Sequence, residues 1–239
     1  MNLTMNNPDE GFPIAFVNAS SVLGRYDSTN IDVALLAKII PPKEYPNVLD
    51  VCCGFGRFTK ALGELGYQAV GLDLSEDQIS KAKASDITGT YLQGDMRDTP
   101  KESYDAIINM YTSFGYFDEE SEDLKALDSW YLSIRPGGVL IMELADMDRA
   151  RAKLPRDKEI IYRVTGDVTE EIRMDWDARI LEVTYLQDGE KFTCYTRLYE
   201  KEKLRSYLLA LGFSSVDIYG NLERKIKDEE DNLILVARK

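Results

Sequence analysis

The sequence predicts an α/β fold of the doubly wound type, with a mostly parallel sheet and an antiparallel β-meander inserted after the fifth strand. Three observations lead to this prediction. Short apolar runs alternate with segments of helical periodicity, which is typical of parallel α/β sheets. A glycine-containing turn follows the first apolar run. After residue 160 the pattern changes to polar–apolar alternation, which is typical of antiparallel strands.

The first predicted unit consists of a strand, a glycine turn and a helix. A helical pattern before it stops at Pro41-Pro42, because the residue before a proline avoids helical conformation. Val48–Val51 is a mostly apolar run, as expected for a strand that is buried on both faces. Beyond the turn, Gly66 ends a helix whose apolar residues recur at i, i+3, i+4 and i+7: Phe58, Ala61, Leu62 and Leu65.

The elements that follow continue the alternation. Gln68–Leu74 is the second predicted strand, and Ser75 with Gln78 forms a capping-box pattern that opens the next helix. Glu120–Ile134 has helical spacing, which the Pro-Gly-Gly sequence at 136–138 breaks. Three further strands are predicted at Tyr91–Gln93, Tyr104–Asn109 and Val139–Leu144.

The alternating region after the fifth strand predicts the meander. Asp188-Gly189 lies between the alternating runs Ile180–Leu186 and Phe192–Tyr199, which is a strong hairpin signal. Helical spacing resumes over 204–211, and two final strands follow at Val216–Tyr219 and Leu233–Ala237. We therefore expect a core made of residues 41–148 and 200–239, and a β insert over 149–199.

Composition excludes several classes of function. The net charge of −13 argues against a nucleic-acid partner, because binding to phosphates needs a basic face. The chain has no histidine and only 3 cysteines, so we expect no metal site and no Ser-His or Cys-His pair. No apolar run is long enough to span a membrane, and the N-terminus lacks the pattern of a secretory signal. We expect a cytoplasmic protein.

Polar residues and glycines gather at the expected strand ends. In an open α/β sheet, ligands bind at the carboxyl ends of the strands. The carboxylate of Asp73 suits the two hydroxyls of a ribose, and glycines let the backbone approach a ligand closely. The residues in these positions are Asp50, Gly54, Gly56, Asp73, Asp95 and Asn109.

The ligand that fits this pattern is a cationic nucleoside. The dinucleotide fingerprint G-x-G-x-x-G needs a third glycine, where this chain has Thr59, and its pyrophosphate would lie near the acid Asp50. An anion is repelled there, whereas an ammonium and a sulfonium are attracted. We therefore predict S-adenosylmethionine (SAM), with an NAD-type dinucleotide as the alternative.

Val48–Phe58 resembles the first motif of the class I SAM-dependent methyltransferases, with Cys52 at the usual first glycine. The strand ending at Asp73, the segment Gln93–Met96 and the turn Arg135–Gly138 are similar to later motifs of that family. The resemblance implies a Rossmann-like, seven-stranded sheet whose last strand is antiparallel. It also implies that the enzyme releases S-adenosyl-L-homocysteine.

The resemblance carries residue roles with it. It places the loop Asp50–Gly56, including Cys52 and Gly54, at the methionine portion of SAM, and Asp73 at the ribose. Residues 1–40 resemble a helical lid segment, from which Arg25 or Tyr26 is expected to reach the SAM carboxylate. The remaining cofactor-binding candidates, at the adenine and after the fourth strand, are Leu74, Asp95, Met96, Asn109 and Met110.

The segment Asn109–Phe117 is similar to a subgroup that methylates amines of sugars, glycine and peptide termini. We therefore expect a small, amine-bearing acceptor. Phe114 and Phe117 are expected in the core. Tyr111 and Tyr116 are expected to line the pocket, because aromatic residues in a loop at a strand end often do so. Methyl transfer needs at most one proton acceptor. The candidates are Tyr111, Tyr116 and Glu143, the last of which could equally be a structural cap.

The insert is expected to contact the acceptor through about half of four residues, since alternate side chains of a strand face opposite ways. These residues are Arg173, Trp176, Tyr195 and Arg197. A non-catalytic SAM-binding module remains the alternative of a different class. The sequence leaves open whether the protein is a monomer or a homodimer.

Overall fold

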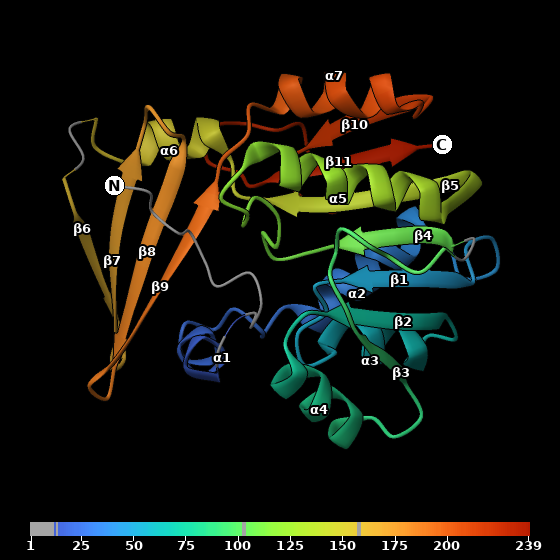
Figure 1. The fold of residues 1–239 in the computed structure, drawn as a ribbon, viewed down its shortest axis with the longest axis horizontal. Helices are drawn as coiled ribbons and strands as arrows, with labels where there is room; N and C mark the ends of the chain where they lie inside the picture. The colour runs from blue at the N-terminus through green and yellow to red at the C-terminus, as the bar shows by residue number, and fades with distance from the viewer. Residues whose placement is uncertain (1–11, 13, 102–103, 157–158) are drawn as a thin grey trace.

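A computed structural model describes residues 12, 14–101, 104–156 and 159–239, and in them the chain forms two sheets (Figure 1). The larger has seven strands in the order β10-β11-β5-β4-β1-β2-β3. Their bounds are β1 (Asn47–Val51), β2 (Gln68–Asp73), β3 (Thr90–Gln93), β4 (Tyr104–Asn109), β5 (Ile134–Leu144), β10 (Ser215–Tyr219) and β11 (Leu233–Arg238). β1 to β5 run parallel to one another, and β11 runs antiparallel to both β5 and β10. This confirms the predicted fold class.

Helices pack on both faces of this sheet. Helices α2 (Thr29–Ile39) and α3 (Arg57–Glu64) cover one face, α5 (Glu120–Ser133) and α7 (Lys201–Leu211) cover the other, and α4 (Glu76–Ser85) packs on β2 and β3. The side chains of β4 alternate between the two cores. Ile107 packs in the core of α5 and α7, whereas Ala106 and Ile108 pack in the core of α2 and α3. Because β4 is buried on both sides, its central residues 106–108 are all apolar.

Two larger differences from the sequence predictions concern one strand boundary and one additional helix. β5 begins at Ile134 and not at Val139, because the backbone at Gly137 and Gly138 pairs with the end of the chain at Lys239. The short helix α6 (Met147–Lys153), capped by the Asp146 side chain, was not predicted. Its seven residues are too few for a visible helical period.

The insert is a four-stranded antiparallel sheet, as predicted. Its strands are β6 (Ile161–Thr165), β7 (Val168–Asp175), β8 (Ile180–Gln187) and β9 (Glu190–Arg197). Asp188 and Gly189 connect β8 to β9 with positive φ angles of 50° and 80°, as a type I′ turn requires. On β7 every second residue is buried, which gives the sheet one inner face.

The insert stands beyond the carboxyl ends of the parallel strands, and helix α1 (Ile14–Val22) lies between it and the core (Figure 1). α1 contacts β8 and β9. Of the expected lid segment 1–40, residues 1–11 and 13 lie outside the described residues, and α1 and α2 form most of the remainder. Among the described residues, no helix has the length and apolarity needed to cross a membrane.

Candidate cofactor and acceptor site

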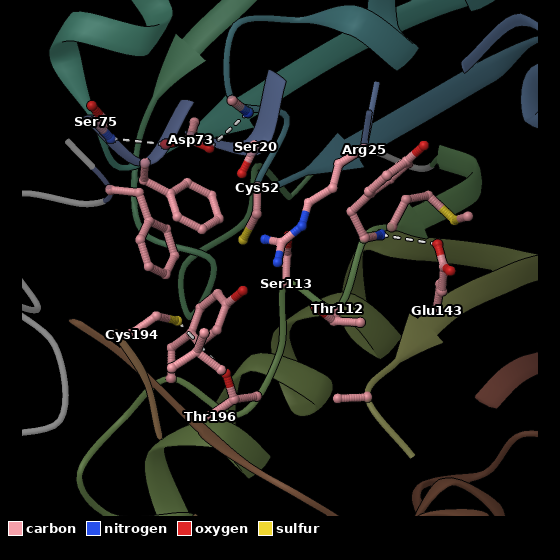
Figure 2. A pocket seen from close by; sticks show the side chains of 18 of the residues that line it. Ser20, Arg25, Cys52, Asp73, Ser75, Thr112, Ser113, Glu143, Cys194 and Thr196 are labelled. Carbon is pink, nitrogen blue, oxygen red and sulfur yellow. Dashed lines mark hydrogen bonds between the residues drawn. The ribbon is translucent and has the colours of Figure 1, made fainter. Parts of the chain in front are cut away.

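A cavity of about 1330 Å³ lies between the carboxyl ends of the parallel strands, α1 and the insert. Single-ligand pockets occupy roughly 300–1,000 Å³, so this cavity has room for two small molecules. Most of the predicted site residues line it: Arg25, Tyr26, Asp50, Cys52, Gly54, Asp73, Leu74, Asp95, Met96, Met110, Tyr111, Tyr116 and Glu143. In Figure 2, Asp73 and Glu143 lie toward opposite sides of the view, with Cys52 and Arg25 between them.

Asp73 ends β2, and two backbone amides hold its carboxylate. The N–H of Gly54 donates to Oδ2 at 2.8 Å, and the N–H of Ser75 donates to Oδ1 at 2.9 Å. Burial raises the pKa of this carboxyl above its usual value. Each oxygen keeps a further lone pair, so the group can still accept hydrogen bonds from a pair of hydroxyls.

Asp50 lies in β1, and its carboxylate binds the N-terminal end of α3. Its Oδ2 accepts from the backbone N–H of Thr59 at 3.1 Å and from the Thr59 hydroxyl at 2.7 Å. Burial raises the pKa of Asp50 to about 7. The position that a pyrophosphate would take at this helix end already holds a side chain of the protein. The geometry therefore disfavours the dinucleotide alternative.

Two predicted cofactor residues do not line the cavity. Gly56 caps α3 with φ of 82°, and a Cβ there would lie 2.5 Å from the Tyr91 ring, so packing explains the glycine. Asn109 is fully buried, and its Nδ2 donates to the carbonyls of Val51 and Ser113 at 3.1 and 3.0 Å. Asn109 therefore joins the end of β1 to the loop after β4. In this structure both residues support the loops beside the cavity, and a contact with the cofactor stays a prediction.

The predicted adenine side contains an ion pair and a sulfur contact. Although burial raises it, hydrogen bonds from Arg97 bring the pKa of Asp95 below its usual value. The Arg97 Nε lies 3.0 Å from both Asp95 oxygens. Cys52 Sγ lies 3.7 Å from Met96 Sδ, and burial raises the pKa of that thiol well above its usual range. Cys52 is therefore a neutral, apolar part of the wall.

In the lid segment, the side chain of Arg25 has a different contact from the predicted one. Arg25 donates to Glu170 Oε1 and to the Tyr185 hydroxyl, both at 2.9 Å, so its guanidinium binds the insert. Sequence reasoning missed Arg57, the first residue of α3, which lines the cavity. Its guanidinium lies 4.2 Å from the centroid of the Tyr26 ring. The sequence signal that could have identified it is an arginine directly after the glycine turn.

The three base candidates have different surroundings. The Tyr111 hydroxyl lies 2.8 Å from Ser28 Oγ and donates to Asp32 at 3.4 Å, so it is bound to the region of α2. Burial raises the pKa of Tyr116 well above its usual range, so this side chain stays a neutral phenol. Neither tyrosine is suited to accept a proton.

Glu143 is the candidate that carries a carboxylate in the cavity. Its Oε2 accepts from the backbone N–H of Tyr111 at 3.2 Å, and its Oε1 accepts from Asn232 Nδ2 at 3.0 Å. Burial raises the pKa of this carboxyl above its usual value. A carboxylate with a raised pKa is a stronger proton acceptor than one with the ordinary pKa.

The four insert residues that we predicted as acceptor contacts lie outside the cavity lining, which is a correction. Arg197 is buried and donates to Asp123 Oδ2 at 2.6 Å, which binds the insert to α5. Arg173 pairs with Glu182, the indole of Trp176 donates to Pro155, and Tyr195 alternates with the lining residues. The residues of β7 and β9 that line the cavity are instead Glu170, Ile172, Phe192, Thr193, Cys194 and Thr196.

The two phenylalanines of the loop after β4 are buried, as predicted. The Phe114 ring packs 5.7 Å from that of Trp130, measured between centroids, and Phe117 is 8% exposed. They stabilise the loop that carries the tyrosines.

Known proteins resemble this chain in sequence and fold. The family described as "Methyltransferase domain" matches residues 48–138. The dTDP-3-amino-3,4,6-trideoxy-alpha-D-glucopyranose N,N-dimethyltransferase of Streptomyces venezuelae is 33% identical over 163 residues, which cover 62% of this chain and 67% of the relative. The glycine/sarcosine/dimethylglycine N-methyltransferase of Actinopolyspora halophila is 28% identical over 202 residues, which cover 80% of this chain and 36% of that relative.

A solved structure has the same fold. It is that of a SAM-bound amino pentose methyltransferase of calicheamicin biosynthesis from Micromonospora echinaspora. The two chains are 19% identical and superpose with a TM-score of 0.73, covering 93% of this chain and 97% of the other.

Proposed function

Because this chain belongs to the class I SAM-dependent methyltransferases, we propose that it methylates the amine nitrogen of a small acceptor, with Glu143 as the proton acceptor. One observation carries the proposal. Glu143 places a half-buried carboxylate in the same cavity as the predicted cofactor residues, and desolvation raises its pKa. The amine class comes from the names of the relatives, which methylate an amino sugar and glycine.

The residues present fit SAM. Asp73 offers a carboxylate to the ribose, and Met96 and Leu74 offer apolar surface to the adenine. Arg57 is a cation in the lining and would pair with the carboxylate of the methionine portion, in place of Arg25. When bound, SAM would supply a methyl group that is activated by a positively charged sulfur. A nucleophile that bonds to the methyl carbon displaces this sulfur directly.

The chain's own contribution is to orient the acceptor, exclude water and remove one proton. As the nitrogen–carbon bond forms and the carbon–sulfur bond breaks, the amine nitrogen becomes positively charged. Its proton passes to Glu143, whose oxygens are held in place by Tyr111 and Asn232. Residues of the insert and of α1 line the cavity, which would reduce the access of solvent to the reacting groups.

The test is an assay of S-adenosylhomocysteine release with a panel of amino sugars, amino acids, phenols and thiols. We expect release with at least one amine. Glu143→Gln removes the proton acceptor, so kcat should fall by roughly 10²–10⁴-fold, the usual contribution of acid–base catalysis.

Calorimetric affinity for S-adenosylhomocysteine should be unchanged by Glu143→Gln. The matched control is Glu64→Gln, which changes an exposed glutamate of α3 outside the cavity lining. Turnover with phenols or thiols but with no amine would contradict the proposed acceptor. Full activity of Glu143→Gln would contradict the role of this carboxylate.

A further inference from the structure

The Glu143 carboxylate has a partner from the far end of the chain. Asn232 directly precedes β11, lines the same cavity and donates its Nδ2 to Glu143 Oε1 at 3.0 Å. Because Tyr111 donates its backbone N–H to the other oxygen, both oxygens of Glu143 accept a hydrogen bond. Two donors fix the plane of a carboxylate and favour its ionised form.

The orientation of the Asn232 amide is determined by chemistry. Arg149 of α6 donates from its guanidinium to Asn232 Oδ1. A guanidinium has donors only, so the amide oxygen must face Arg149 and the amide nitrogen must face Glu143. The bridge from Arg149 through Asn232 to Glu143 therefore has one possible direction, and at its end it presents an N–H to the carboxylate.

The loop that carries Asn232 is anchored on the same helix. Lys227 pairs with Asp146, the cap of α6, at 2.7 Å, and their side chains are 4% and 1% exposed. Lys153, at the end of α6, pairs with Glu230 at 2.6 Å. These contacts keep Asn232 next to Arg149, so the bridge belongs to an ordered contact between α6 and the last loop.

The charges facing Glu143 come from several elements. Asp32 on α2 raises its pKa and Arg149 on α6 lowers it, while burial is the largest effect and raises it. Asp146 is compensated by Lys227, and the register partner of Glu143 on β11 is the apolar Ile234. Asn232 is the side chain that bonds directly to the carboxylate, and its hydrogen bond lowers the pKa.

We propose that Asn232 is a positioning residue for methyl transfer: oriented by Arg149, it holds the Glu143 carboxylate in the cavity and sets the pH at which it accepts the proton. This inference rests on the proposed function. Removal of the donor should leave the carboxyl harder to ionise. The ascending limb of the rate against pH should then move to higher pH, because the reaction needs Glu143 ionised.

The experiment compares pH profiles of kcat for the wild type and three variants. Asn232→Ala should move the midpoint of the ascending limb up by about one pH unit, the scale of one lost hydrogen bond. Asn232→Asp has the same shape but faces Glu143 with an oxygen, so the midpoint should move further. Arg149→Ala frees the amide to turn and should move it less. A role in packing alone would make Asn232→Asp the mildest of the three.

Asn221→Ala is the matched control, because Asn221 lies in the same loop and accepts from the Lys225 backbone. Its profile should match the wild type. Titration of the Glu143 carboxyl by ¹³C NMR reads the same property without turnover. If wild type methylates amines, Glu143→Gln is slow, and Asn232→Ala and Asn232→Asp keep the wild-type midpoint, this inference fails while the proposed function stands. If Glu143→Gln keeps full activity, both fail.

Discussion

We expect cofactor binding to depend most directly on the side chain of Asp73. Gly54 and Ser75 orient it through their backbone amides, so it is ready to accept hydroxyls without rearrangement. Asp73→Ala should weaken binding of S-adenosylhomocysteine by about 1.5–3 kcal/mol, the value of hydrogen bonds to a charged group. Titration calorimetry measures this. Asp98→Ala, at an exposed site after β3, should leave the dissociation constant unchanged. An unchanged constant in Asp73→Ala would refute the assignment.

The carboxyl of Asp50 should make stability depend on pH. Its pKa is raised by burial to about 7 from 3.8, so between these values the folded state holds a proton that the unfolded state has lost. Stability from this group is therefore present below pH 4 and is lost as pH rises to 7.

Asp50→Asn keeps an oxygen for the Thr59 donors and removes the titration. Between pH 5 and pH 8, the wild type should lose about 2–3 kcal/mol of unfolding free energy relative to this variant. Urea denaturation at each pH measures the difference. Parallel pH dependences of the two proteins would show that Asp50 does not titrate in this range.

At the scale of elements, β9 docks on the loop after β4 through backbone contact at one glycine. Gly115 has φ of 91°, and its carbonyl accepts from the N–H of Arg197 at 2.7 Å. A Cβ at Gly115 would lie 2.4 Å from the Arg197 carbonyl oxygen, which is backbone and cannot turn aside. This contact places the inner face of β9 against the loop after β4, which carries Tyr111 and Tyr116.

Gly115→Ala should therefore cost more than the roughly 1–2 kcal/mol of left-handed strain alone. The matched control is Gly189→Ala in the β8–β9 turn, where φ is 80° and nothing lies within 4 Å of the added Cβ. Urea unfolding should show a larger loss for Gly115→Ala than for Gly189→Ala. Equal losses would mean that β9 moves away at little cost.

At the scale of the whole molecule, a buried ion pair fastens the insert to the core. Arg197 of β9 donates to Asp123 of α5, whose side chain is fully buried, and also to the Phe117 carbonyl at 2.8 Å. The Tyr199 hydroxyl adds a bond to the same carboxylate at 2.8 Å. The side of the cavity that the insert lines thus depends on charge pairing between β9 and α5.

Arg197→Met should destabilise the protein by about 3–5 kcal/mol, because it leaves the charge of Asp123 buried without its partner. The double variant Arg197→Met with Asp123→Asn removes both charges and should recover part of this loss. Thermal unfolding of the wild type and of both variants tests the expectation. If the double variant were no more stable than the single one, lost packing and not the unpaired charge would explain the effect.

The sequence alone determined the order and type of most elements, the glycine turn, the hairpin at Asp188-Gly189 and the acid at the end of β2. These features follow from local patterns: periodicity, turn chemistry and the position of a residue relative to a strand end. The type of ligand followed from Thr59 and Asp50, since both affect the same helix end.

Only the tertiary structure decided which side chains meet in the cavity. Several features depend on loop paths that no local sequence pattern determines. They are the contact of Arg25 with the insert, the inner face of β7 and β9, and the supporting roles of Gly56 and Asn109. The bridge from Arg149 through Asn232 to Glu143 joins three segments far apart in the chain. Such contacts form only when packing of the whole chain places the segments side by side, because register and loop path are set by long-range burial.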